Sequence, residues 1–179
     1  TSKVTGTLPV ANGGTNLTSG FANGITEADI WRITTHFSGD ANPITSYWER
    51  PDDATATKIG TGMTESSGIF TFPSTGIWRV AFNHSFYQNG DDRDVTNYIK
   101  ISSDSGSNYD TVALSSGFIQ QTNSNNTHNG VICYAYVDVT NASTFRASFR
   151  VSKTNSNTNT VGGTDDNRTF VEFLRLGDT

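Results

Sequence analysis

The stretch that decides the fold is GIWRVAFNHSFYQ, residues 76–88. Large apolar side chains alternate with other side chains along it, which is the period of an extended strand with one buried face. Arg79, Asn83 and Ser85 fall on the opposite face, so the stretch predicts a β-strand that packs on a core from one side. The predicted buried face consists of Trp78, Val80, Phe82 and Phe86.

Turn signals and further strand-like runs lie outward from this stretch. The sequence Asn89-Gly90-Asp91-Asp92 follows it directly and favours a tight turn. No helical periodicity lasts for three turns anywhere in the chain. About nine or ten short strands separated by turns predict an all-β protein, an antiparallel jelly-roll β-sandwich. The other predicted strands are 30–37, 44–49, 68–72, 95–101, 112–118, 130–139, 144–151 and 169–176.

Two of these strands are apolar on both faces. In 130–139 the side chains of Tyr134 and Tyr136 alternate with those of Cys133 and Ala135, and the strand 169–176 shows the same pattern. One face of a sheet in a lone antiparallel sandwich is normally wet. Such strands are therefore either covered by loops or buried between subunits, and we favour the second. The candidate trimer-interface residues are Trp31, Tyr134, Tyr136 and Phe173.

Length and composition divide the chain into two parts. Its 179 residues suit one domain with a short extension. Residues 1–26 are rich in Gly, Asn and Thr and carry few bulky side chains, so they predict an extended neck or linker that does not fold alone. Residues 27–179 are the predicted jelly-roll head. The chain starts at Thr1 without a Met, so we expect a fragment or a processed product.

Charge and cysteine content exclude several functions. The formal net charge of −5 and the lack of a basic run make nucleic acid an unsuitable partner. No apolar stretch approaches the roughly 18 residues of a membrane-spanning helix, so we expect no membrane insertion. Cys133 is the single cysteine, which rules out an intrachain disulfide. Its place in an apolar alternation predicts a buried, inert thiol.

The segment 68–82, GIFTFPSTGIWRVAF, resembles the aromatic signature of the complement-1q-like globular heads. The family pattern runs Phe-Thr, then Pro, then Gly, aromatic, any residue and apolar. The closing segment 169–174, TFVEFL, is similar to the family's terminal Thr-Phe-x-Gly-Phe-Leu, with Glu172 at the Gly position. These heads share a trimeric jelly roll with tumour necrosis factor, so the resemblance implies a homotrimer. The matching positions are Phe70, Pro73, Gly76, Trp78 and Val80.

A second resemblance lies in the predicted neck. Residues 6–15, GTLPVANGGT, are similar to a segment that recurs in bacteriophage tail-fibre proteins. The two resemblances together imply a fibre neck that leads into a trimeric head. Heads of such fibres commonly bind the host surface, so the resemblance implies that role and a location in the virion fibre, outside the host cell.

The sequence shows no catalytic or metal-binding motif. His36, His84 and His128 have no partner at a metal-ligand spacing, and no nucleophile elbow, phosphate loop or dinucleotide fingerprint occurs. Adjacent carboxylates in loops do not give the facing pair of a glycosidase. We therefore expect no enzyme and no cofactor.

Long polar loops are the candidate binding elements. Loops 88–94, 120–129 and 153–168 are rich in Asn, Ser, Thr and Asp, which suit hydrogen bonds to sugar hydroxyls. The acidic groups in them could alternatively hold calcium, which prefers several oxygen ligands, or simply be solvated turns. The candidate binding residues are Asp91, Asp92, Asn125, Asn126, Asn157, Asp165 and Asp166.

These observations predict the receptor-binding head of a viral, specifically bacteriophage, fibre protein. Three weak sites on one fibre would attach it to a host cell-surface glycan or outer-membrane protein by avidity. The alternatives are a structural capsid or fibre cap that only trimerises, a bacterial adhesin head and, least favoured, a capsule depolymerase.

Overall fold

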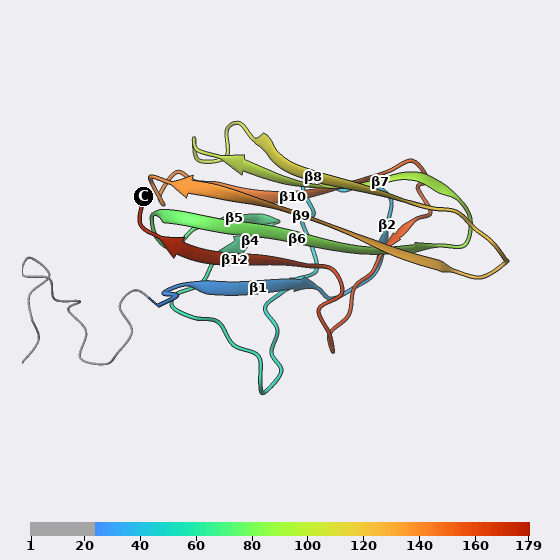
Figure 1. Ribbon diagram of the computed structural model, residues 1–179, viewed down its shortest axis with the longest axis horizontal. Coiled ribbons are helices and arrows are strands. Elements are labelled where there is room, and N and C mark those ends of the chain that lie inside the picture. The colour runs from blue at the N-terminus through green and yellow to red at the C-terminus, as the bar shows by residue number, and fades with distance from the viewer. Residues whose placement is uncertain (1–23) are drawn as a thin grey trace, which may run out of the picture.

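The computed structural model describes residues 24–179 and consists of two antiparallel sheets packed face to face (Figure 1). The first strand, β1, spans Ala28–Ile33. The predicted neck, residues 1–26, lies outside the described residues apart from its last three positions. Residues 24–179 contain no helix with the length and apolar character needed to cross a membrane.

The first sheet has seven strands and carries the stretch 76–88 near its centre. That stretch forms β6, Gly76–Gln88, which pairs along its whole length with β9, Thr127–Val139. On its other side β6 pairs with β12, Phe170–Gly177, and β12 pairs with β1. The short strands of this sheet are β2 (Phe37–Ser38), β3 (Trp48–Glu49) and β11 (Asn159–Thr160).

The second sheet has five strands in the order β4-β5-β10-β7-β8. The neighbours β10 and β7 are far apart in the sequence, as are β12 and β6 in the first sheet, which is the crossing connectivity of a jelly roll. The bounds are β4 Thr64–Ser66, β5 Ile69–Thr71, β7 Asp92–Ser102, β8 Asp110–Ile119 and β10 Arg146–Lys153.

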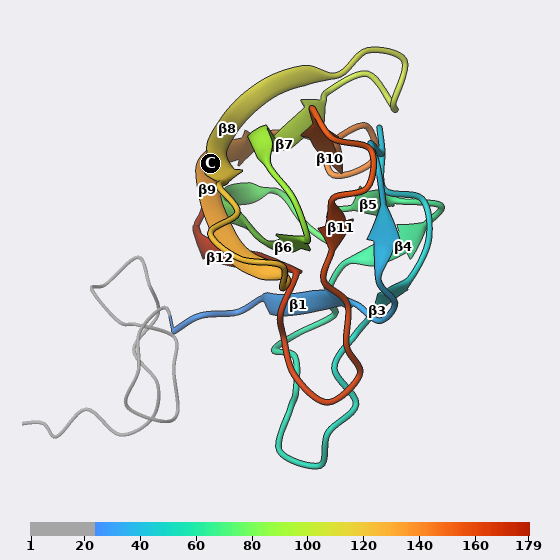
Figure 2. The same cartoon turned by 90° about the vertical axis from the view of Figure 1, so that its right-hand side faces the viewer.

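Strands β8 and β9 lie side by side and close one flank of the sandwich (Figure 2). They belong to different sheets, because β8 pairs with β7 and β9 pairs with β6. The outward sides of β8 and β9 therefore lie next to each other at the junction of the two sheets.

Aromatic rings fill the core between the sheets. Phe70 on β5 lies in its middle, with ring centroids 5.3 Å from Trp48, 5.4 Å from Phe149 and 5.3 Å from Phe173. The predicted buried face of β6 is confirmed, because Trp78, Val80, Phe82 and Phe86 all lose essentially all their exposure. Buried Ile and Val side chains such as Ile99 and Val151 pack around the rings, each of which buries a large area.

Several predicted strand bounds differ from the structure. The predicted strand 30–37 is two strands, because β1 ends at Ile33 and β2 begins at Phe37. The predicted loop 120–129 is shorter, since β9 begins at Thr127 and pairs there with Gln88. Within the predicted loop 153–168, Asn159 and Thr160 pair with Tyr87 and Phe86 of β6 as strand β11.

Candidate functional site: the loop cluster around Asp91

Three loops meet at the end of the sandwich opposite the C-terminus (Figure 1). They are the β6–β7 turn, the β8–β9 loop and the β10–β11 loop, all parts of the predicted binding loops. Asp91 of the turn ties them together: its Oδ1 accepts the backbone N–H of Gln121 at 2.8 Å, and its carbonyl oxygen accepts the side-chain amide of Asn155 at 3.0 Å. The Gln121 side chain also donates to Asn89 Oδ1. We call this assembly the tip.

The carboxylate of Asp92 is buried and stabilises the tip from within. It is 1% exposed, and its Oδ2 accepts the hydroxyl of Thr158 at 2.5 Å. Its Oδ1 accepts the hydroxyl of Thr154 at 2.8 Å. The carboxylate of Asp92, a predicted binding residue, thus accepts its hydrogen bonds from the β10–β11 loop that it holds in place.

Arg93 is a residue of the tip whose side chain is not used to hold the loops together. The β7–β8 pairing shifts between Asp92 and Val95, so Arg93 lies in an irregular part of the ladder. The side chain is exposed, and within residues 24–179 it has no hydrogen-bond or ion-pair partner. Two hollows adjoin it, one of about 360 Å³ toward β8 and one of about 390 Å³ toward the β10–β11 loop.

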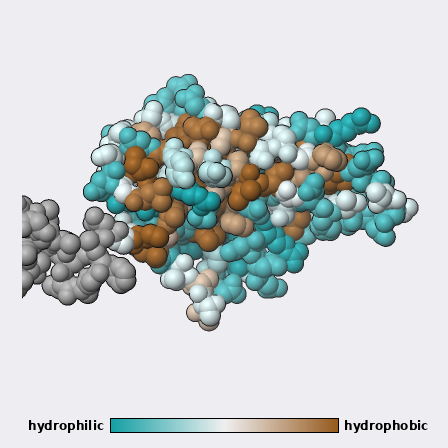
Figure 3. Space-filling model, in the orientation of Figure 1, coloured by the Kyte–Doolittle hydropathy of each residue, from teal (hydrophilic) through white to brown (hydrophobic). Residues whose placement is uncertain are grey.

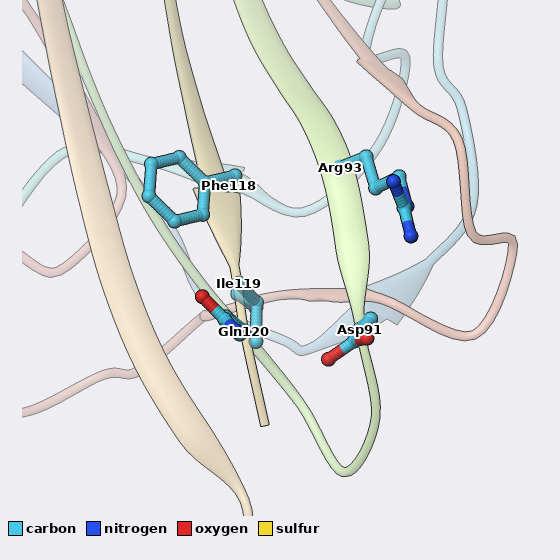
Figure 4. Close-up of a pocket in the computed structure, with 5 residues that line it drawn as sticks. All are labelled: Asp91, Arg93, Phe118, Ile119 and Gln120. Carbon is cyan, nitrogen blue, oxygen red and sulfur yellow. The ribbon is translucent and has the colours of Figure 1, made fainter. Parts of the chain in front are cut away.

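Figure 4 shows how the first hollow is built. Phe118 on β8 and Arg93 on β7 lie on its two flanks, and their side chains point away from each other. Asp91, Ile119 and Gln120 form the rest of its lining. The second hollow shares Asp91 and Arg93 and adds Asp92, Thr154, Asn155 and Ser156.

The structure brings together only part of the predicted binding set. Asn125, Asn126 and Asn157 are exposed in the loops of the tip, as is Asp91. Asp165 and Asp166 lie instead in the separate β11–β12 loop, where Arg168 donates to Asp166 at 2.7 Å. That loop borders its own hollow of about 440 Å³ beside His36.

Arg93 and Phe118 were missed by the sequence analysis. Arg93 carried a signal, since it is a lone cation in the acidic run Asp91-Asp92-Arg93-Asp94. Phe118 carried a misleading one, because its alternation with Val112 and Leu114 is also that of a core face.

The other chemically notable side chains are buried. His84 is fully buried, and burial together with the charge of Lys153 lowers its pKa to about 3. Burial raises the pKa of Cys133 to about 11, which confirms a buried thiol and keeps it protonated at neutral pH. Among residues 24–179, no group of three or more His, Cys, Asp or Glu side chains is arranged to hold a metal ion.

A second notable surface is the outward face of β8 and β9. Figure 3 shows hydrophobic side chains gathered over these strands and their neighbours β6 and β12. Tyr134 is 57% and Tyr136 66% exposed, and their ring centroids lie 6.3 Å apart. Leu114 of β8 is 56% exposed. We call this surface the β8–β9 face, and its members are Val112, Leu114, Ile132, Tyr134 and Tyr136, while Phe118 lies on the same side of β8 at the end toward the tip.

Charged residues line the side of the β8–β9 face that continues onto the first sheet. The Arg79 guanidinium lies 5.5 Å from the ring centroid of Tyr134 and pairs with Glu172 at 2.6 Å. Glu172, at the position where the complement-1q-like pattern has glycine, thus forms a cross-strand ion pair between β12 and β6.

Two of the four predicted interface residues do not reach this surface. Phe173 is 0% exposed and packs among core rings, because its register with Val80 of β6 turns it inward. Trp31 also faces inward, with its ring edge-on to Phe70 at 5.7 Å, and the Arg50 guanidinium covers it at 4.4 Å. Phe173 is therefore a core residue and Trp31 is partly buried against the core, so only Tyr134 and Tyr136 remain as interface candidates.

The fold is that of the tumour-necrosis-factor-like jelly rolls. The Eiger TNF of S. frugiperda superposes with a TM-score of 0.62 over 85% of this chain and 93% of that one, at 12% identity. Murine APRIL superposes with a TM-score of 0.61 over 84% of this chain and 98% of that one, at 10% identity. No protein-family model and no curated protein matches the sequence. The expected jelly roll is confirmed, and the likeness extends to the fold alone.

Proposed function

We propose that this chain is the receptor-binding head of a bacteriophage fibre, which forms a homotrimer and attaches the virion to the host surface by multivalent binding. The observation that carries the proposal is the difference in chemical character between two surfaces. The β8–β9 face is apolar and suits contact with further copies of the chain, while the tip is polar and hollowed and suits a ligand.

The β8–β9 face supports assembly. Contiguous exposed aromatic and aliphatic side chains commonly mark a protein interface. A second copy of the chain is the occupant that fits, because the resemblance of segment 68–82 to complement-1q-like heads implies a trimer. A heterologous contact repeated by a three-fold rotation closes into a ring and leaves no such face exposed.

The positions at which the described chain begins and ends in the sandwich support the proposal of a fibre head. The strand β1 begins, and β12 ends, at the end of the sandwich opposite the tip (Figure 1). A neck that enters at Ala28 would therefore leave the tip pointing away from the fibre. Residues 6–15, which resemble a phage tail-fibre segment, supply the viral part of the proposal and lie outside the described residues.

Avidity supplies the mechanism. Three tips on one rigid head bind a dense surface far more tightly than one tip, because the second and third contacts form at a high effective concentration. The tip then needs only weak affinity for each copy of the receptor.

The test combines solution mass with cell binding. Light scattering on residues 1–179 should give three times the chain mass of 19.3 kDa. The double variant Tyr134→Lys, Tyr136→Lys should be a folded monomer, while Thr55→Lys, at an exposed site away from the face, should remain a trimer. Labelled trimer should decorate bacterial cells of a susceptible host, and the monomer should decorate them much less.

The results separate the candidate functions. A wild-type monomer contradicts the assembly step and with it the avidity mechanism. A trimer that binds no cell across a broad bacterial panel contradicts attachment and favours a structural fibre cap.

A further inference from the structure

We infer that the two hollows beside Arg93 bind a neutral oligosaccharide, with one sugar ring in each hollow and Arg93 between them. This inference rests on the proposed attachment function and names the ligand class of the tip. Each hollow, about 360 and 390 Å³, is large enough for a small ligand.

The donors and acceptors of the first hollow match sugar hydroxyls. Arg93 has five N–H donors, and none is used within the described part of the chain. Asp91 uses one carboxylate oxygen for Gln121, and its other oxygen has no partner among residues 24–179. The exposed Gln120 amide can both donate and accept. A hydroxyl also does both, so neighbouring sugar hydroxyls can satisfy all three side chains together.

The charge of the hollows selects an uncharged sugar. The first hollow holds one cation, Arg93, and one anion, Asp91, so its own charge is balanced. Asp92 and Asp94 add negative charge on either side of Arg93. A carboxylated or sulfated sugar would meet this repulsion. A neutral ring avoids that cost.

Phe118 adds the apolar contact that sugar sites need. Its ring is 59% exposed on the flank of the first hollow (Figure 4). The C–H face of a pyranose buries well against an aromatic ring. The second hollow is lined by polar residues, with Thr154, Asn155 and Ser156 as its far wall, so it suits a more hydroxylated neighbouring unit.

Nuclear magnetic resonance titration of the full chain tests the inference directly. The probes are gluco-, galacto-, manno- and N-acetylglucosamine oligomers as neutral sugars, with sialyllactose and oligogalacturonate as acidic ones. A neutral oligomer should shift the Arg93 Nε–H signal and the backbone signals of Gln120 and Asn155. Arg93→Ala should weaken its binding at least tenfold, since charge-assisted hydrogen bonds to a sugar are lost. Phe118→Ala should weaken it several-fold.

Arg168→Ala is the matched control, because Arg168 is another exposed arginine in a different loop. Equal binding by Arg93→Ala and Arg168→Ala, binding of acidic sugars alone, or no shift with any neutral oligomer overturns the inference. Cell decoration by the same variants separates this inference from the proposed function. Decoration that survives Arg93→Ala leaves attachment standing and removes the hollows as its site. A wild-type head that ignores cells removes attachment, while the titration still decides what the hollows bind.

Discussion

His84 Nε2 lies 3.0 Å from the Oγ1 of Thr160, and both side chains are completely buried. Lys153 donates its ammonium to the same Thr160 oxygen at 2.9 Å. The hydroxyl proton of Thr160 is then free to point at His84, which therefore accepts with a neutral ring. The ring hydrogen then lies on Nδ1, which has no partner within the described residues, and a second proton would place a charge in a fully buried site beside Lys153, which is costly.

The buried histidine predicts a loss of stability in acid. Burial, and next the charge of Lys153, lowers the pKa of His84 to about 3 from its ordinary value of 6.5. Between these pH values the unfolded chain binds more protons than the folded one, so stability falls as pH falls from 6.5 toward 3. From pH 6.5 to 4.5 the contribution of this group is about 2–3 kcal/mol at most.

Urea unfolding at pH 7 and at pH 4.5, at one protein concentration, measures this loss. His84→Asn should lower the difference between the two pH values, and the exposed-histidine control His128→Asn should leave it unchanged. An unchanged difference in His84→Asn would assign the acid loss to other groups.

Lys153 predicts a second window, at alkaline pH, in which stability also rises with pH. Its pKa is lowered to about 8 from 10.5, chiefly by burial, although Asp40 and Asp92 oppose the shift. The unfolded chain binds the extra proton between pH 8 and 10.5, so this group makes the fold more stable as pH rises through that range. Wild type should gain about 2 kcal/mol relative to Lys153→Met between pH 8 and pH 10.

The measurement is the difference between the two proteins in their urea midpoints at pH 8 and pH 10. Taking the difference cancels groups that titrate in both proteins, such as the tyrosines. Parallel curves would show that the Lys153 ammonium is solvated in the folded state.

The sequence was sufficient for the fold because strand alternation is local. The period of two along β6 identifies its buried face without any knowledge of its neighbours. The same rule fails for β12, where both faces are apolar, and so it assigned Phe173 to an interface. Only the register of Phe173 with Val80 shows which face turns inward.

The candidate site was predicted less completely because it depends on topology. The loops at Asp91 and Asn155 are 64 residues apart, and only the strand order places them together. The same approach of the two loops brings Thr154 and Thr158 onto the buried carboxylate of Asp92. Asp165 and Asp166 lie in an equally polar stretch of sequence, yet they belong to the connection from β11 to β12, which lies apart from the tip.

The stability of the fold should depend strongly on having glycine at position 68, because of the backbone conformation there. It adopts φ +81°, a conformation that side chains rarely accept, and an added Cβ would collide with the carbonyl group of Ile44. Gly68→Ala should destabilise the fold by at least about 1 kcal/mol, because strain and collision act together. Gly177→Ala is the control, since nothing lies within 4 Å of its added Cβ. Thermal melts of the two variants should separate clearly, and equal melts would contradict the close approach of Gly68 to Ile44.

Phe70 and Phe118 make the most direct comparison between the core and the proposed ligand site. Phe70 is fully buried among four rings, whereas Phe118 is 59% exposed beside Arg93. Phe70→Ala removes those contacts and leaves a cavity, so it should cost about 3–5 kcal/mol in urea unfolding. Phe118→Ala should change stability by no more than about 0.5 kcal/mol, because it deletes an exposed ring. A large loss of stability in Phe118→Ala would mean that the ring is buried in the assembled protein, and its exposed face would then be unable to receive a sugar.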